Sequence, residues 1–321
     1  MKGVTAAQMK ALSATDMGEL TTTQIGGLAA NQMSALTGTQ LSALSSTQVG
    51  ALTTSQIKGL TNAQVSALSA TDIGELSTTQ VSALTADQIK NLSTTNLSAM
   101  TSTQMSALSN SQMAALTATQ IKGLSTTDIG ELSATQVGRL TTAQVGALAT
   151  TQVQQLSTTQ VGGLSSSQVA ALSAANLNQL DATQVGALTT TQVKGLSTSQ
   201  LAGLNATSVG NLATTQLGAL SASQLAGMGS TNFAALNSTQ VGALSTDQIK
   251  GLTASQLKAL SATDMGELTT TQVSALTPAQ MGALAATQVS ALTSTQTGAL
   301  TASQIKGLTV SYTHLTLPTK A

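Results

Sequence analysis

The chain has 321 residues, 41% of them hydrophobic, and its 11 basic and 11 acidic side chains give a net charge of zero. It contains no Cys and no Trp and only one Phe, which excludes disulfides and thiolate metal sites and argues against an ordinary aromatic-rich core. The balanced charge gives no reason to expect nucleic acid or anionic lipid as a partner, and no apolar run approaches the roughly 18 residues of a membrane span. The hydrophobic content argues against disorder.

From Lys2 to Thr309 the sequence repeats every eight residues. We number the slots so that slot eight is the residue that is Leu in nearly every octad, and slot one is the Ser or Thr that usually follows it. Slot five is nearly always Val, Ile, Leu or Met, and slot four is nearly always Gln. The exceptions in slot four are Asp16, Asp72, Asn96, Asp128, Asn176, Ser208, Asn232 and Asp264. Such self-similarity predicts one repeat array over residues 1–309, in which neighbouring octads stack.

A period of eight suits neither one continuous helix nor one plain strand. Eight residues at about 100° each overshoot two helical turns by about 80°, so the Leu stripe would spiral around the helix. In a strand, slots five and eight would face opposite sides. The chain must therefore change direction within every octad.

Slots one and four have the pattern of a helix capping box. In the octad that begins at Thr53, the hydroxyl of Thr53 would accept from the amide of Gln56, whose side chain would reach back to the cap amide. Leu52 and Ile57 would form the hydrophobic staple of the same helix. We therefore predict an all-α solenoid of very short capped helices, one per octad and about six residues long, stabilised by stacking around a ribbon of slots five and eight. A β-solenoid of Thr-rich strands with turns at Gly is the alternative.

Other residue preferences agree with short helices. Pro278 falls directly after the cap Thr277, at the first helical position, where Pro is favoured. The Asp residues lie between the cap and the third helical position, and the array Lys residues lie in slot six near the helix end; the helix dipole favours both placements. Asp87 with Lys90, and Asp247 with Lys250, are three residues apart and can form ion pairs. Gly in slots six and seven would let each helix end and turn. Slot one holds a weak cap in four octads, at Ala29, Ala149, Ala213 and Ala285.

The strongest candidate for chemistry is a repeated pair of carboxylates three residues apart. The pairs are Asp16 with Glu19, Asp72 with Glu75, Asp128 with Glu131, and Asp264 with Glu267. Acid/base work or weak Ca²⁺ binding is conceivable, but Ca²⁺ needs six to eight oxygens and no further acidic residue is near in the sequence. We interpret the pairs as caps and surface charges, and the Met residues of slots five and eight as core. The sequence therefore predicts no catalytic, cofactor-binding or metal-binding residue, and no enzyme. In a β-solenoid, rows of Thr could form an ice-binding face, although Ala, Ser and Asp interrupt those rows.

The octads resemble a known kind of repeat. Runs such as "LTTTQIGG", "LSTTQVSA" and "LTASQIKG" are similar to octapeptide repeats, of the form L-[ST]-x-x-[QD]-[VI]-x-[AG], in large bacterial surface or exported proteins, often labelled haem-utilisation or adhesion proteins. The resemblance implies an extracellular or cell-surface location and a spacer or adhesive stalk. A multivalent module that recognises carbohydrate, a surface or itself is the alternative. The haem label finds no support, because His and Tyr are absent from the array.

Both ends depart from the pattern. Met1 falls in slot five and no apolar signal-peptide core follows it, so we expect the array to be a fragment of a longer one. The octad stops at Val310, and the stretch "VSYTHLTLPT", which holds Tyr312, His314 and Pro318, resembles a translated sequencing adapter. We expect residues 310–321 to be a non-native tail rather than a site.

Overall fold

The computed structural model describes residues 3–312, with side chains up to Leu308, and divides into two compact units, residues 1–163 and 164–321. Within the described range every octad forms one short α-helix and no strand occurs, which confirms the all-α solenoid over the β-solenoid. The helices have four to six residues, except for the last, which has 11.

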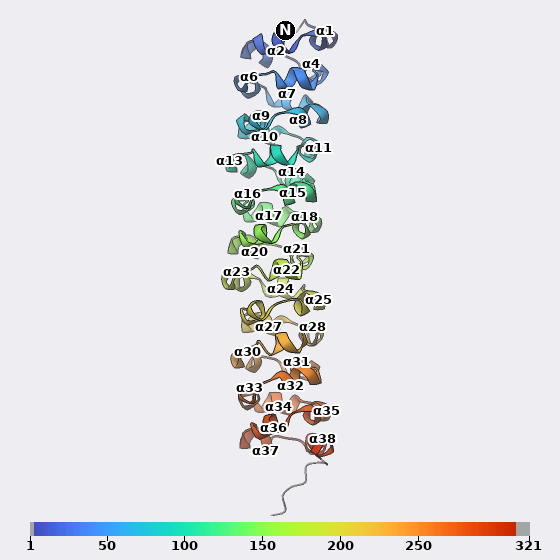
Figure 1. Cartoon of the computed structure of the whole chain (residues 1–321), viewed down its shortest axis with the longest axis vertical. Helices are drawn as coiled ribbons and strands as arrows, with labels where there is room; N and C mark the ends of the chain where they lie inside the picture. Colours follow the sequence, from blue (N-terminus) through green and yellow to red (C-terminus); the bar gives the residue numbers. More distant parts are fainter. Residues whose placement is uncertain (1–2, 313–321) are drawn as a thin grey trace, which may run out of the picture. The chain divides into compact units, whose positions relative to one another are not determined.

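In the first unit (blue to green in Figure 1) the helices are α1 (Ala6–Ala11), α2 (Ala14–Glu19), α3 (Thr22–Gly26), α4 (Ala30–Ala35), α5 (Gly38–Ser42), α6 (Ser46–Gly50), α7 (Thr54–Gly59), α8 (Asn62–Ala67), α9 (Ala70–Glu75), α10 (Thr78–Ala83), α11 (Ala86–Lys90), α12 (Thr94–Ser98), α13 (Ser102–Ser106), α14 (Asn110–Ala115), α15 (Ala118–Gly123), α16 (Thr126–Glu131), α17 (Ala134–Arg139), α18 (Thr142–Gly146), α19 (Thr150–Gln154) and α20 (Thr158–Gly163).

In the second unit they are α21 (Ser166–Ala171), α22 (Ala174–Leu177), α23 (Ala182–Ala187), α24 (Thr190–Lys194), α25 (Thr198–Ala202), α26 (Ala206–Gly210), α27 (Thr214–Ala219), α28 (Ala222–Gly227), α29 (Gly229–Phe233), α30 (Ser238–Gly242), α31 (Thr246–Gly251), α32 (Ala254–Ala259), α33 (Ala262–Glu267), α34 (Thr270–Ala275), α35 (Pro278–Ala283), α36 (Ala286–Ser290), α37 (Ser294–Gly298) and α38 (Ala302–Tyr312).

Helices stack on others three octads away. In the first unit α4 packs against α7 and α7 against α10, and in the second α21 packs against α24 and α24 against α27. Side-chain hydrogen bonds join octads four apart, as between Gln80 and Leu52. Each coil of the solenoid therefore contains more than three and fewer than four octads.

The caps follow the predicted chemistry. Thr53 Oγ1 accepts from the Gln56 amide at 3.3 Å, and Gln56 Oε1 accepts from the Thr53 amide at 2.7 Å. Pro278 occupies the first position of α35, as predicted. The Ala caps make only half of this motif: Ala149 offers no side-chain acceptor, while its amide still donates to Gln152 Oε1 at 2.8 Å.

The predicted role of Gly at the helix ends is wrong. The chain turns where slot eight and the next slot one are both extended, as at Leu60 (φ −66°, ψ 138°) and Thr61 (φ −71°, ψ 157°). Gly229, with φ 79°, is the single residue of the described range with a positive φ. Slot-seven Gly instead permits close stacking, because a Cβ at Gly203 would lie 2.6 Å from the Cβ of Ala174 in an earlier coil.

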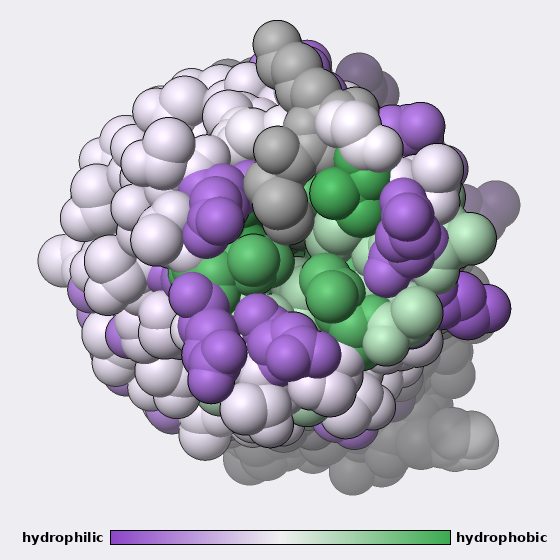
Figure 2. Space-filling model, turned by 90° about the horizontal axis from the view of Figure 1, so that it is seen from above, coloured by the Kyte–Doolittle hydropathy of each residue, from purple (hydrophilic) through white to green (hydrophobic). Residues whose placement is uncertain are grey.

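The core is the predicted ribbon of slots five and eight. Ile57 is fully buried and Leu52 is 4% exposed, and all the Met residues of the array from Met9 to Met281 are buried. Figure 2, viewed from above, shows apolar residues gathered at the centre of the end face and surrounded by more polar ones. Apolar burial of this kind supplies most of the stability that such short helices lack on their own.

Candidate functional site

The main polar feature of the interior is the slot-four Gln, which bonds in two directions. Gln80 lies on α10, and its Oε1 accepts from the cap amide of Ser77 at 2.7 Å. Its Nε2 donates to three carbonyl oxygens of the preceding coil: Val49 at 3.1 Å, Gly50 at 3.2 Å and Leu52 at 2.8 Å. One side chain thus completes its own cap and also binds the end of a helix four octads earlier.

The same bonds recur along both units. Gln104 donates to Ile73, Gly74 and Leu76, and Gln280 donates to Ile249, Lys250 and Leu252. Both Gln side chains are buried, at 3% and 7% exposure. The slot-five carbonyl already accepts from the slot-eight amide of its own octad, as Ile73 does from Leu76 at 3.3 Å. The Gln amide adds a second bond there and also binds the later carbonyls, which would be costly to bury without a partner. We call this repeated set of contacts the amide ladder.

Shorter residues in slot four keep only one of the two functions. Asn96 donates to the Leu68 carbonyl at 3.1 Å and forms no capping box. Asp72 does the reverse: its Oδ2 accepts from the amide and hydroxyl of Ser69 at 2.9 and 2.7 Å. A side chain one methylene shorter than Gln cannot reach both groups, and a carboxylate has no proton to donate to a carbonyl.

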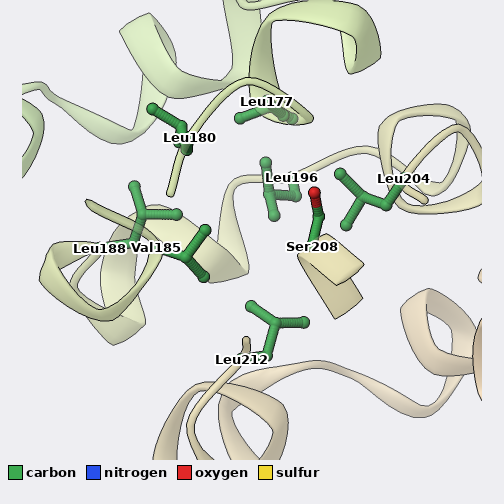
Figure 3. Close-up of a pocket in the computed structure, with 8 residues that line it drawn as sticks. All are labelled: Leu177, Leu180, Val185, Leu188, Leu196, Leu204, Ser208 and Leu212. Carbon is green, nitrogen blue, oxygen red and sulfur yellow. The ribbon is translucent and has the colours of Figure 1, made fainter. Parts of the chain in front are cut away.

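Ser208 performs neither function, and a small cavity lies beside it. The cavity is lined by apolar side chains that include Leu177, Leu180 and Leu212, and the hydroxyl of Ser208 points among them (Figure 3). Leu177 and Leu180 hold the carbonyls that a Gln would bind. The cap amide of Asn205 donates instead to Asn178 Oδ1 at 2.8 Å, so Asn178 replaces half of the missing Gln.

The Asp/Glu pairs are divided between two environments. The four Asp side chains are capping residues, as predicted, and Asp72 and Asp128 are buried at 6% and 8% exposure. The partner Glu side chains are exposed. The structure gives no reason for Glu in that slot.

The charged groups are mostly at the surface. Lys250 Nζ lies 3.9 Å from Asp247 Oδ1, and both side chains are largely exposed, so this expected pair contributes little. The other expected pair, Asp87 with Lys90, is not an ion pair within the described range. Hydrogen bonds from Ser13 lower the pKa of Asp16, and those from the Thr183 hydroxyl and the Gln184 amide lower the pKa of Asp181.

The outer surface carries shallow grooves built from the same slots. One is lined by Ala70, Thr94, Thr95, Ser98, Ala99 and Gly123. A second is lined by Ala134, Thr135, Gly138, Arg139 and Gly163. Slots two, three, six and seven therefore form a surface that repeats from coil to coil.

Three observations bear on metals, membranes and the tail. Residues 3–312 contain no group of three or more His, Cys, Asp or Glu side chains that could hold a metal ion. In the same part of the chain, none of the helices has the length and apolar character needed to span a bilayer. α38 continues through Leu308 to Tyr312, past the point where the octad stops, while His314 and Pro318 lie outside the described residues.

Comparison with known families supports the repeat. Residues 59–94, 140–174, 209–246 and 222–254 match the ALTTAQ repeat family. The six letters of the family's name correspond to slots seven and eight of one octad and slots one to four of the next, as in "ALTTSQ" from Ala51 to Gln56. The matched segments cover less than half of the chain, and they identify a structural repeat array. No curated protein matches the chain.

Proposed function

We propose that the array is a non-enzymatic spacer or adhesive stalk of a bacterial surface or exported protein, located outside the cell. The observation that carries this proposal is the amide ladder, which recurs with the same slots in coil after coil. Whole octads can be added or removed without changing any kind of contact, so the length of the array can vary while its fold stays the same. The sequence resemblance to surface-protein repeats supports the location.

A spacer requires that distance along the array grow in proportion to the number of octads. The absence of Cys makes this measurable, since single cysteines can be introduced and labelled selectively. Thr23, Thr79 and Thr135 are exposed slot-three residues of the first unit, separated by equal numbers of octads. We expect the spin-label distance from Thr23 to Thr135 to be about twice that from Thr23 to Thr79, whereas a flexible chain would give a ratio of about 1.4.

The role itself is tested by shortening the array. Removal of residues 77–132 deletes seven whole octads and preserves the slot order. With the array placed between a surface anchor and a binding domain, a spacer should lose reach in proportion to the deletion. Replacing those octads with others of different exposed residues should restore the reach. Failure of that replacement would contradict the spacer.

A multivalent binding module is the second candidate, and the repeated surface grooves favour it. A binder that uses each coil once should lose avidity steeply when octads are removed, because every added contact acts at a high local concentration. Arrays of different length attached to beads, without any other domain, would be tested on carbohydrate surfaces and on one another. A spacer alone should bind none of these at any length.

A further inference from the structure

The carboxylate pairs of the first unit recur every 56 residues, which is seven octads. The pairs are Asp16 with Glu19, Asp72 with Glu75, and Asp128 with Glu131. All three Glu side chains occupy slot seven and are exposed. None of the described residues forms an ion pair with these carboxylates. The Glu side chains are therefore open to a partner from outside the chain.

The interval of 56 residues corresponds to two coils of the solenoid. Ladder bonds to slot eight span 28 residues in both units, as from Gln80 to Leu52 and from Gln216 to Leu188. Residues that share a slot and are 56 positions apart therefore lie on the same side of a unit, two coils from one another. The helices of the second and third pairs, α9 and α16, lie one below the other on one side of the first unit (Figure 1). We call this line of three pairs the acidic row.

Lysines of the second unit follow the same interval. Lys194, Lys250 and Lys306 are also 56 residues apart, and all three are exposed slot-six residues. We call them the basic row. Asp247 lies 3.9 Å from Lys250, but both side chains are largely exposed, so this weak pair can be exchanged for another at little cost. The two rows have opposite charge and equal spacing, because two coils of the same repeat set both intervals.

The surface between the charges of the acidic row does not oppose an approach. The helices α6 and α13 lie on the same side of the first unit as α9 and α16 (Figure 1). Their sequences, STQVG and STQMS, contain no charged residue. The chain as a whole has zero net charge, so no long-range repulsion keeps two copies apart.

We propose that the acidic row of one copy of this chain docks on the basic row of a second copy, so that the first unit of one copy lies against the second unit of another. A single exposed ion pair contributes little. Three pairs held at a common spacing act together, because the first contact brings the other two to a high local concentration. The proposal rests on the second candidate function, the multivalent binder, for which it names the partner, and it does not depend on the spacer role.

The test measures self-association of the full chain by sedimentation velocity, with one variant for each row. The two variants are Glu19→Gln/Glu75→Gln/Glu131→Gln and Lys194→Gln/Lys250→Gln/Lys306→Gln. The Asp residues stay in place because they cap their helices. The native chain should associate in about 20 mM NaCl and at least about tenfold more weakly in about 1 M NaCl, where the Debye length falls to about 3 Å.

Each variant alone should associate at least about tenfold more weakly than the native chain at low salt, because three ion pairs are lost. An equimolar mixture of the two variants should associate again, as a 1:1 complex, since one variant retains the acidic row and the other retains the basic row. Only a contact between the two rows of different copies predicts this recovery.

The control variant is Lys10→Gln/Lys58→Gln/Lys122→Gln. It also removes three exposed slot-six lysines, but at intervals of 48 and 64 residues, which do not correspond to two coils. It should associate as the native chain does. A native chain that stays monomeric at low salt would overturn the proposal, and so would a mixture that associates no better than its components. A control that associates as weakly as the basic-row variant would overturn it too. None of these results changes the spin-label distances that test the spacer.

Discussion

Ser208 offers the most direct test of the amide ladder, because it is the one slot-four residue that can reach neither the cap nor the preceding coil. We expect Ser208→Gln to stabilise the second unit. The new Nε2 would donate to the carbonyls of Leu177 and Leu180, as Gln216 does to Val185 and Leu188 at 2.7 Å each. The longer side chain would also fill the cavity of Figure 3.

The expected gain follows from these contacts. Two hydrogen bonds contribute about 0.5–1.5 kcal/mol each, and the buried methylene adds about 0.8 kcal/mol. Ordering a Gln side chain costs up to about 2 kcal/mol, and the cap amide of Asn205 contributes nothing new because Asn178 already binds it. The net stabilisation should be about 1 kcal/mol.

Urea unfolding followed by circular dichroism gives the free energy of unfolding, and hydrogen exchange of octads 173–180 and 205–212 locates the change. The comparison variant is Gln216→Ser, which removes the bonds to Val185 and Leu188 and also the bond from the Ala213 amide, and it should destabilise by about 2–4 kcal/mol. The reasoning is refuted if Gln216→Ser has this cost while Ser208→Gln leaves both the free energy and the local exchange unchanged.

Three further predictions concern caps, stacking and pH. Ala149→Ser should stabilise the chain by about 1 kcal/mol in urea unfolding, because it supplies the missing side-chain acceptor. The control Thr150→Ser, at the adjacent exposed position, should leave the free energy of unfolding unchanged. Equal effects of the two substitutions would contradict the role of the cap. Gly203→Ala should lower the Tm, since its Cβ would lie 2.6 Å from the Cβ of Ala174. Gly186→Ala, whose Cβ would have no atom within 4 Å, should raise the Tm because Ala favours the helix over Gly. Equal shifts of the Tm in the two variants would argue against close stacking. The lowered pKa of Asp181 means that its contribution is present above the ordinary value of 3.8 and is lost as the pH falls through the folded-state pKa. The native chain should therefore lose stability relative to Asp181→Asn in acid unfolding below about pH 4, and parallel curves would refute this.

The cap at each helix could be predicted from the sequence because it depends on residues three apart. Thr53 and Gln56 carry the whole signal, and so do Pro278 and the staple residues. The core could be predicted for the same reason, since slots five and eight are apolar in almost every octad.

The connection between coils could not be predicted in this way. The number of octads per coil depends on the backbone angles of extended residues such as Leu60 and Thr61. The eight-residue period of the sequence does not determine these angles. One signal for the amide ladder was present, however. A capping box accepts Glu as readily as Gln, yet slot four never holds Glu. That preference favours a role for the NH₂ group of Gln as a donor, a role that the four slot-four Asp residues give up. Asn232, which bonds to Leu201 and forms no box, keeps only this role.

The amide ladder also determines how the array responds to force. Its hydrogen bonds join residues no more than 31 positions apart, and each coil is held by its own set of several bonds to the preceding one. Under tension the coils should therefore detach one after another, each releasing roughly 28 residues, or on the order of 100 Å of extended chain. Because every coil repeats the same contacts, a detached coil can re-form on its neighbour, so the array can lengthen under load and recover without unfolding as a whole.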